Sequence, residues 1–241
     1  MSQFQEMTIS EIVSEHNSAA DVFEKYRLNF CCNGEVTVKE AMTKAKGPLN
    51  DLLEELELAI AAESDENINF NNLSVTEVSE ILRSDYHMFL RNKISEIATI
   101  SRNILAKYKE EKIDLVHDIL MAMFNHLAPH MVSEEKVLFP YLEYMEHTVL
   151  KGKVPKPASF GKLKKSVSAM LDDHEDSATQ LDELRKITND YTCWNDADDD
   201  LRHFYNELKL LDRNLRMHIF IENYVLFKKA RAMEDQLQAK I

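Results

Sequence analysis

Apolar side chains recur at helical spacing along most of this chain. Beyond residue 74 the spacing i, i+3, i+4, i+7 persists through four long stretches, at about 75–110, 113–147, 159–191 and 197–238. Gly152 and Pro155 break the pattern between the second and third stretches, and a cluster of aspartates stands at the start of the fourth. Because four long helices with short connections pack as neighbours, the pattern predicts an antiparallel four-helix bundle.

The first 62 residues show shorter helical patterns with their own start signals. Thr8 with Glu11, and Thr37 with Glu40, have the spacing of a capping box, which marks a helix N-terminus. Residues 63–73 then lose apolar periodicity and are rich in asparagine and acidic residues. The chain is therefore predicted to be all-α, with a small helical domain at 1–62, a linker at 63–74 and the bundle at 75–241.

The composition agrees with a helical protein and narrows its partners. Only four glycines occur in 241 residues, fewer than strands joined by tight turns need. A net charge of −13 makes nucleic acid an unexpected partner, since phosphate binding requires clustered Lys and Arg. The chain contains no run of about 18 apolar residues, so no membrane-spanning segment is predicted. The start of the chain lacks a secretory pattern, and three cysteines do not suggest a disulfide framework, so we expect a cytoplasmic protein.

A ten-residue pattern occurs twice in the predicted bundle. The segments that begin at His130 and at His218 both read His-x-x-x-Glu-x-x-Val-Leu-Phe. A lone histidine precedes each copy at nearly the same distance, His87 by 43 residues and His174 by 44. The bundle is therefore predicted to consist of two related helical hairpins, each with one lone histidine and one His-x-x-x-Glu pair.

These residues have the spacing and chemistry of metal ligands. Residues i and i+4 share one helix face, so the histidine and glutamate of each pair can converge on one ion. Counting from the turns places the four histidines in one layer of the bundle. Imidazoles with carboxylates that can bridge two ions favour non-haem iron, ahead of manganese and zinc. The candidate ligands are His87, His130, Glu134, His174, His218 and Glu222.

The order of these ligands separates two classes of helical di-metal protein. Ferritin-like sites use Glu-x-x-His pairs and more carboxylate than imidazole, whereas here the order is reversed and histidine dominates. Over about 75–241 the chain resembles haemerythrin-like (HHE cation-binding) domains. With the upstream pattern Phe23-x-x-Tyr26 and the turn Cys31-Cys32-x-Gly34, the whole chain resembles the Ric family, whose di-iron proteins repair iron–sulfur clusters after nitric oxide or peroxide damage.

The resemblance implies a specific site. It implies two non-haem iron ions, oxo- or hydroxo-bridged, on the six candidate ligands, and it makes Cys31 and Cys32 candidate catalytic residues. The chain departs from the Ric pattern at Asn29, where we would expect aspartate. It departs from oxygen-carrying haemerythrins at Ala178, where those proteins have a fifth histidine, so about two coordination positions are expected to stay open.

Two further residues are predicted to support the ligands from outside. His126 lies one turn before His130, and Asp173 lies beside His174. A third His-x-x-x-Glu pair, His203 with Glu207, is predicted to be a surface pair, because it lies 15 residues before His218 on the same helix.

The leading hypothesis for function is repair of iron–sulfur clusters damaged by oxidative or nitrosative stress, by supplying iron or handling nitric oxide. The partners it implies are damaged iron–sulfur proteins and nitric oxide or oxygen species. The alternatives are a module that binds or senses oxygen or nitric oxide, and a nitric oxide or peroxide reductase. Whether the chain is itself an enzyme, and whether it forms a homodimer, stay open at this point.

Overall fold

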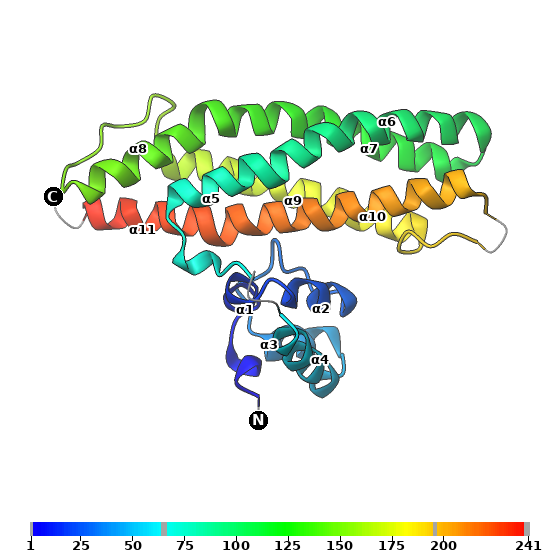
Figure 1. The fold of residues 1–241 in the computed structure, drawn as a ribbon, viewed down its shortest axis with the longest axis horizontal. Coiled ribbons are helices and arrows are strands. Elements are labelled where there is room, and N and C mark those ends of the chain that lie inside the picture. Colours follow the sequence, from blue (N-terminus) through cyan, green and yellow to red (C-terminus); the bar gives the residue numbers. More distant parts are fainter. Residues whose placement is uncertain (1, 64–66, 195–196, 239–241) are drawn as a thin grey trace. The chain divides into compact units, whose positions relative to one another are not determined.

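The computed structural model describes residues 2–63, 67–194 and 197–238, which are helical throughout their regular elements. They divide into two compact units, Met1–Val78 with Arg216–Ile241, and Ser79–Leu215. The predicted all-α class is confirmed: short helices come first, and long helices that form a bundle follow (Figure 1). No helix within the described ranges is long and apolar enough to cross a membrane.

The first unit opens with four short helices, two of which are capped as the sequence predicts. They are α1 (Ile9–Glu15), α2 (Ala19–Lys25), α3 (Val38–Ala45) and α4 (Leu49–Ala61). Both predicted capping boxes are present, at the start of α1 and of α3, so the first amides of each helix have side-chain acceptors. The core of these helices includes Phe23 and Leu52, both fully buried.

The same unit contains the last part of the chain. It includes the π-helical segment η5 (Ile221–Leu226) and the helix α11 (Phe227–Gln238). The helix α1 and the short 3₁₀ segment η2 (Phe70–Asn72) both pack against η5. Phe220 and Phe227, at the two ends of η5, are almost fully buried and anchor the segment in the core.

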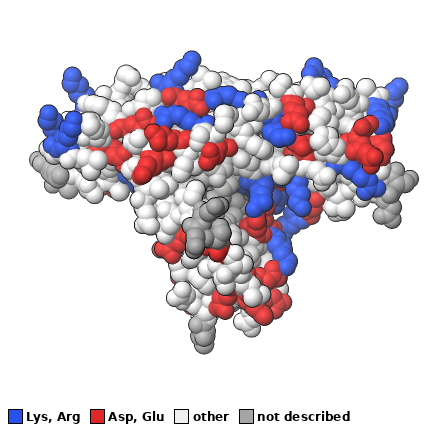
Figure 2. All heavy atoms as spheres, viewed as in Figure 1, with Lys and Arg blue, Asp and Glu red and all other residues white. Residues whose placement is uncertain are grey.

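The second unit is built from long helices joined by short turns. They are α6 (Met88–Lys107), α7 (Glu111–Ser133), α8 (Phe139–Leu150) and α9 (Leu163–Thr188), followed by most of α10 (Asp199–Phe220). The helix α7 packs against both α6 and α9. On the face that Figure 2 shows, acidic and basic side chains are interspersed over the long helices.

Three π-helical segments interrupt the long helices of the described chain. They are η3 (Leu82–His87), which connects α5 (Val75–Ile81) to α6, η4 (Glu134–Leu138), which connects α7 to α8, and η5. Each contains one of the predicted ligands: His87, Glu134 or Glu222. Pro140 follows η4 at the start of α8 and has no N–H to donate to the preceding turn, which gives this interruption a local cause. Single π turns in α-helices are frequent at functional sites.

Candidate metal centre

The six predicted ligands are all buried. Their exposed fractions run from 0% for His87, Glu134 and Glu222, through 1% for His218 and 3% for His174, to 7% for His130. Removing carboxylates and imidazoles from water is costly unless charge or hydrogen bonds compensate for the loss of hydration. A compensating partner is therefore required at this place in the protein.

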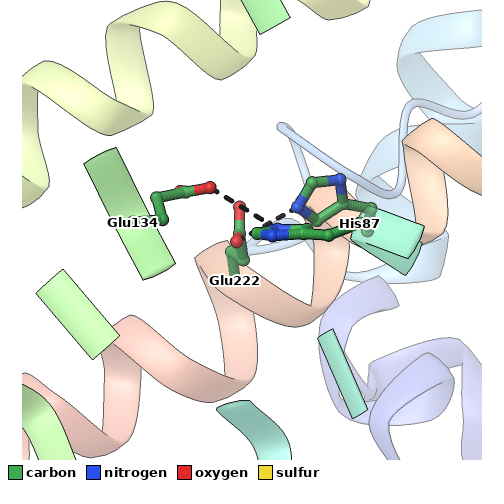
Figure 3. Close-up of side chains that lie close together, drawn as sticks. His87, Glu134 and Glu222 are labelled. Carbon is green, nitrogen blue, oxygen red and sulfur yellow. Dashed lines mark ion pairs between the residues drawn. The ribbon is translucent and has the colours of Figure 1, made fainter. Parts of the chain in front are cut away.

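The ligand atoms fall into two groups that share their carboxylates. One group is His87, Glu134, His218 and Glu222, and the other is His130, Glu134, His174 and Glu222. In each group one ligand atom from every residue lies within 4.8 Å of the others. Figure 3 shows the side chains of His87, Glu134 and Glu222 pointing toward one another. Because a carboxylate has two oxygens, Glu134 and Glu222 can each serve both groups.

The distances in these groups fit cations of ordinary size. At bonds of about 2.1 Å, two ligands at right angles on one ion are roughly 3.0 Å apart. The Nε2 atom of His130 is 3.1 Å from Oε1 of Glu134 and 3.2 Å from Nε2 of His174. In the second repeat, Nε2 of His218 is 3.1 Å from Oε1 of Glu222. The wider separation of 3.6 Å between Nε2 of His87 and Oε2 of Glu134 fits a larger angle.

Glu134 shows most directly that the protein alone leaves this site incomplete. Both of its carboxylate oxygens are buried, and neither accepts a hydrogen bond from the described residues. A buried carboxylate in that state is strongly destabilising unless a positive charge balances it. Two cations between the shared carboxylates and the imidazoles would supply that balance, so the donor set fits a pair of metal ions.

Carboxylates also hold two of the imidazoles from the far side. The Nδ1 atom of His87 is 2.9 Å from Oε1 of Glu135, and that of His130 is 3.2 Å from Oδ2 of Asp173. A carboxylate at Nδ1 favours the tautomer with its proton on Nδ1, which leaves the Nε2 lone pair for a metal ion. The Arg91 guanidinium, 2.6 Å from Glu135, completes the first of these chains.

The charge on Glu135 is secured by its partners. Its partial burial acts to raise the pKa, but hydrogen bonds from Arg91 and His87 and the positive charge of Arg91 outweigh burial, so the pKa of Glu135 lies below its usual value. Glu135 is not among the residues that the sequence predicts for the site. Its position next to Glu134 was the only signal, and adjacent residues on a helix point in different directions.

His126 and Asp173 lie beside the two groups and belong to neither. His126 is exposed, and its Nε2 atom is 3.5 Å from Oδ1 of Asp173. The other oxygen of Asp173 contacts His130. Asp173 thus joins an exposed imidazole to a buried one.

The third His-x-x-x-Glu pair is separate from these groups. His203 is exposed, with its Nδ1 atom 4.0 Å from Oε1 of Glu207. Glu207 is itself buried, and its carboxylate pairs with Lys93 at 2.6 Å. Glu96 joins His203 and Glu207 in a small cluster of possible metal ligands. Lys93 also pairs with Glu96, at 2.9 Å. The lysine already pairs with both carboxylates that a metal ion would need.

The two adjacent cysteines lie in the turn between α2 and α3. Cys31 is buried and Cys32 is half-buried, and no disulfide joins their sulfur atoms, which are 3.6 Å apart. The side-chain oxygen of Asn29 accepts hydrogen bonds from the Cys31 thiol, at 3.2 Å, and from the Cys32 amide, at 3.0 Å. An aspartate could accept the same two bonds, so the departure at Asn29 preserves the shape of the turn.

Comparison with protein families divides the chain in two. Residues 78–230 match the model of the hemerythrin HHE cation binding domain. Residues 5–60 match a domain of unknown function, DUF542.

Curated relatives are similar over nearly the full length. The iron-sulfur cluster repair protein ScdA of Staphylococcus haemolyticus is 24% identical over 232 residues, which cover 93% of this chain and 97% of that protein. The iron-sulfur cluster repair protein YtfE of Cronobacter sakazakii is 28% identical over 239 residues, covering 96% of this chain and 99% of that protein. The YtfE protein of Dickeya chrysanthemi is 25% identical over 238 residues, with coverage of 94% and 97%.

Proposed function

Because the chain belongs to the hemerythrin HHE cation-binding family, we propose that it holds a pair of iron ions and uses them in the repair of damaged iron–sulfur clusters. The observation that carries this proposal is the sharing of Glu134 and Glu222 by two buried groups of ligands. The repair role is supported by relatives named as iron–sulfur cluster repair proteins, which the chain matches along nearly its whole length.

We assign the first ion to His87 and His218 and the second to His130 and His174, with Glu134 and Glu222 serving both. The donor set of nitrogen and carboxylate oxygen suits non-haem iron. When bound, an iron pair would supply redox-active ions with open coordination positions at which small molecules can bind. The same incomplete coordination would allow iron to leave the site.

The ligand count limits how tightly the site is filled. Four imidazoles and two bridging carboxylates supply eight of the about twelve bonds that two six-coordinate ions form, and one oxo or hydroxo bridge would add two, which leaves about two positions open. One turn after His174 the chain has Ala178, a buried residue whose methyl group offers no further ligand. A site with fewer protein ligands than an oxygen carrier is suited to exchanging or releasing iron.

The surrounding residues prepare the ligands for that task. Glu135 and Asp173 keep the protons of His87 and His130 on Nδ1, so both Nε2 atoms face inward as acceptors. Asp173 is half-exposed, whereas Glu135 is tied to Arg91. We therefore infer that the side of the site near His130, its most exposed ligand, exchanges with solvent more readily than the side near His87.

Iron content is the first test. Protein purified without oxygen is expected to contain two iron ions per chain, and the double variant His87→Ala/His218→Ala is expected to lose most of them. His203→Ala is the matched control, since this exposed histidine also belongs to a His-x-x-x-Glu pair. Absence of bound iron in the parent protein, or full retention in the double variant, would contradict the proposed site.

Cluster repair is the second test. An enzyme inactivated by nitric oxide damage to its iron–sulfur cluster should regain activity faster with the iron-loaded protein than with the metal-free protein or with an equal amount of free iron. Equal recovery in all three cases would contradict the repair role while leaving the metal site intact. The damaged iron–sulfur proteins themselves are the partners that this proposal requires.

A further inference from the structure

Two residues that directly follow the ligand Glu222 hold the turn with the adjacent cysteines. The side-chain amide of Asn223 donates a hydrogen bond of 2.9 Å to the backbone carbonyl of Cys31. The backbone amide of Gly34 donates one of 2.7 Å to the hydroxyl of Tyr224. All of these residues, with Glu222, belong to the first compact unit.

Aromatic packing secures the same contact. The ring of Phe30, just before the cysteines, lies 5.8 Å from the ring of Phe220, which in turn lies 5.5 Å from the ring of Tyr224. Phe30 and Phe220 are nearly completely buried. Ring pairs at this distance add to the stabilisation that burial of their area provides. The turn is therefore fixed to η5 by two hydrogen bonds and an apolar cluster.

The glycine of the Cys-Cys-x-Gly pattern has a steric reason at this contact. A Cβ atom at Gly34 would lie 3.0 Å from each of three atoms: the carbonyl oxygen of Phe30, Cβ of Ser10 and Cε2 of Tyr224. Two of these atoms belong to the backbone or to the base of a short side chain, so they cannot easily move. Glycine therefore lets the Gly34 amide approach the Tyr224 hydroxyl without displacing these neighbours.

The helix places these contacts next to the metal ligand. Consecutive side chains on a helix point in different directions, so Glu222 can face the metal groups while Asn223 and Tyr224 contact the turn. All three lie within η5. Its π-helical form departs from the regular α-helical hydrogen-bonding pattern, as is frequent at functional sites.

We propose that Asn223 and Tyr224 are positioning residues that couple the Cys31–Cys32 turn to the metal ligand Glu222. This inference rests on the proposed function, in which Glu222 is a ligand. Displacing the turn then changes how firmly Glu222 holds its ions, and binding of the ions restrains the turn. Because coupling between two sites is reciprocal, metal binding and the state of the cysteines must affect each other by the same factor.

The variant Tyr224→Phe tests this coupling. It retains the ring and removes the hydroxyl that accepts a hydrogen bond from the Gly34 amide. We expect iron to pass from the loaded variant to a chelator about fivefold faster than from the parent protein, the factor that one hydrogen bond of about 1 kcal/mol represents. The absorption bands of the oxidised iron pair should also shift. Tyr26→Phe is the matched control, because it removes a hydroxyl bonded to Glu55 at 2.9 Å in the same unit.

The rate of thiol labelling distinguishes coupling to the metal site from a purely structural effect of the substitution. In the parent protein, iron loading should slow the labelling of Cys31, which is buried. In Tyr224→Phe this protection by iron should shrink. Gly34→Ala should have a similar effect. In the double variant Gly34→Ala/Tyr224→Phe, the change in free energy should be smaller than the sum of the two single changes, since both substitutions act on one contact.

Two outcomes would overturn the inference. One is iron release from Tyr224→Phe at the rate of Tyr26→Phe, and the other is a labelling rate of Cys31 that does not depend on iron in the parent protein. If the parent protein binds no iron pair, the proposed function fails. If it binds the pair and Tyr224→Phe behaves as the parent does, only the coupling fails.

Discussion

Replacing Glu134 by glutamine should stabilise the metal-free protein and destroy the proposed metal site. Glu134 is fully buried without a hydrogen bond from the described residues, and its carboxylate lies within 4.8 Å of that of Glu222. Two ionised carboxylates at this limiting separation repel each other by about 3 kcal/mol at an effective dielectric constant near 20, and a shorter separation gives a stronger repulsion. The glutamine side chain removes this repulsion but remains buried, so we expect a net stabilisation of about 2 kcal/mol.

Thermal unfolding with and without iron measures both effects. For a chain of this size, about 2 kcal/mol corresponds to a rise in melting temperature of roughly 4–8 °C. The parent protein at an iron concentration a hundred times its Kd should gain about 2.7 kcal/mol from binding, and Glu134→Gln should gain little. The variant should therefore melt above the parent protein without iron and below it with iron.

Glu175→Gln is the control for this reversal in the order of melting temperatures. Glu175 follows the proposed ligand His174 but is exposed, so its replacement should change neither melting temperature by more than about 1 °C. A metal-free Glu134→Gln protein that melts below its parent would refute the argument from buried charge. A variant that still binds two iron ions per chain would refute the bridging role of Glu134.

Three further predictions concern other contacts. Asp173→Asn should weaken iron binding about tenfold in a chelator competition, since it removes the carboxylate at Nδ1 of His130; unchanged affinity would exclude this support. Burial raises the pKa of Glu63, but hydrogen bonds from His16 and Ser18 outweigh it and lower the pKa, so stability should be lost as the pH falls below about 4.5 and through that lowered pKa. The urea midpoint of Glu63→Gln should therefore depend less on pH than that of the parent protein, and an equal dependence would contradict this. Thr37→Ala should lower the melting temperature by about 2–4 °C through loss of a capping box, and an unchanged value would show that the cap is not needed.

The helices and the family could be predicted because both depend on local or repeated patterns. Apolar periodicity identified the four long helical stretches, and the capping boxes at Thr8 and Thr37 identified two helix starts. The repeated His-x-x-x-Glu pairs, with the cysteine turn before them, predicted a family that joins a small domain to an HHE bundle. Matches to both domains confirm that prediction.

Features that depend on the folded arrangement could not be predicted. Apolar spacing continues through the three π-helical segments, so nothing in it distinguishes them from regular helix. The Gly34–Tyr224 hydrogen bond joins residues 190 positions apart, and neither residue type suggests the other. Glu207 lies in a predicted surface pair but is buried, because Lys93 comes from another helix to neutralise it.

The three π-helical segments also restrict how the length of this chain can vary. A π turn contains one residue more than the α-helical turn that it replaces, so deleting one residue within η5 would restore a regular helix. The restored helix would rotate the two parts of the chain around the deletion by about 100° relative to each other. Glu222 and the buried Phe227 could then no longer both keep their present directions. Homologous proteins that retain the metal centre should therefore tolerate insertions and deletions in their connecting turns and exclude them from these three segments.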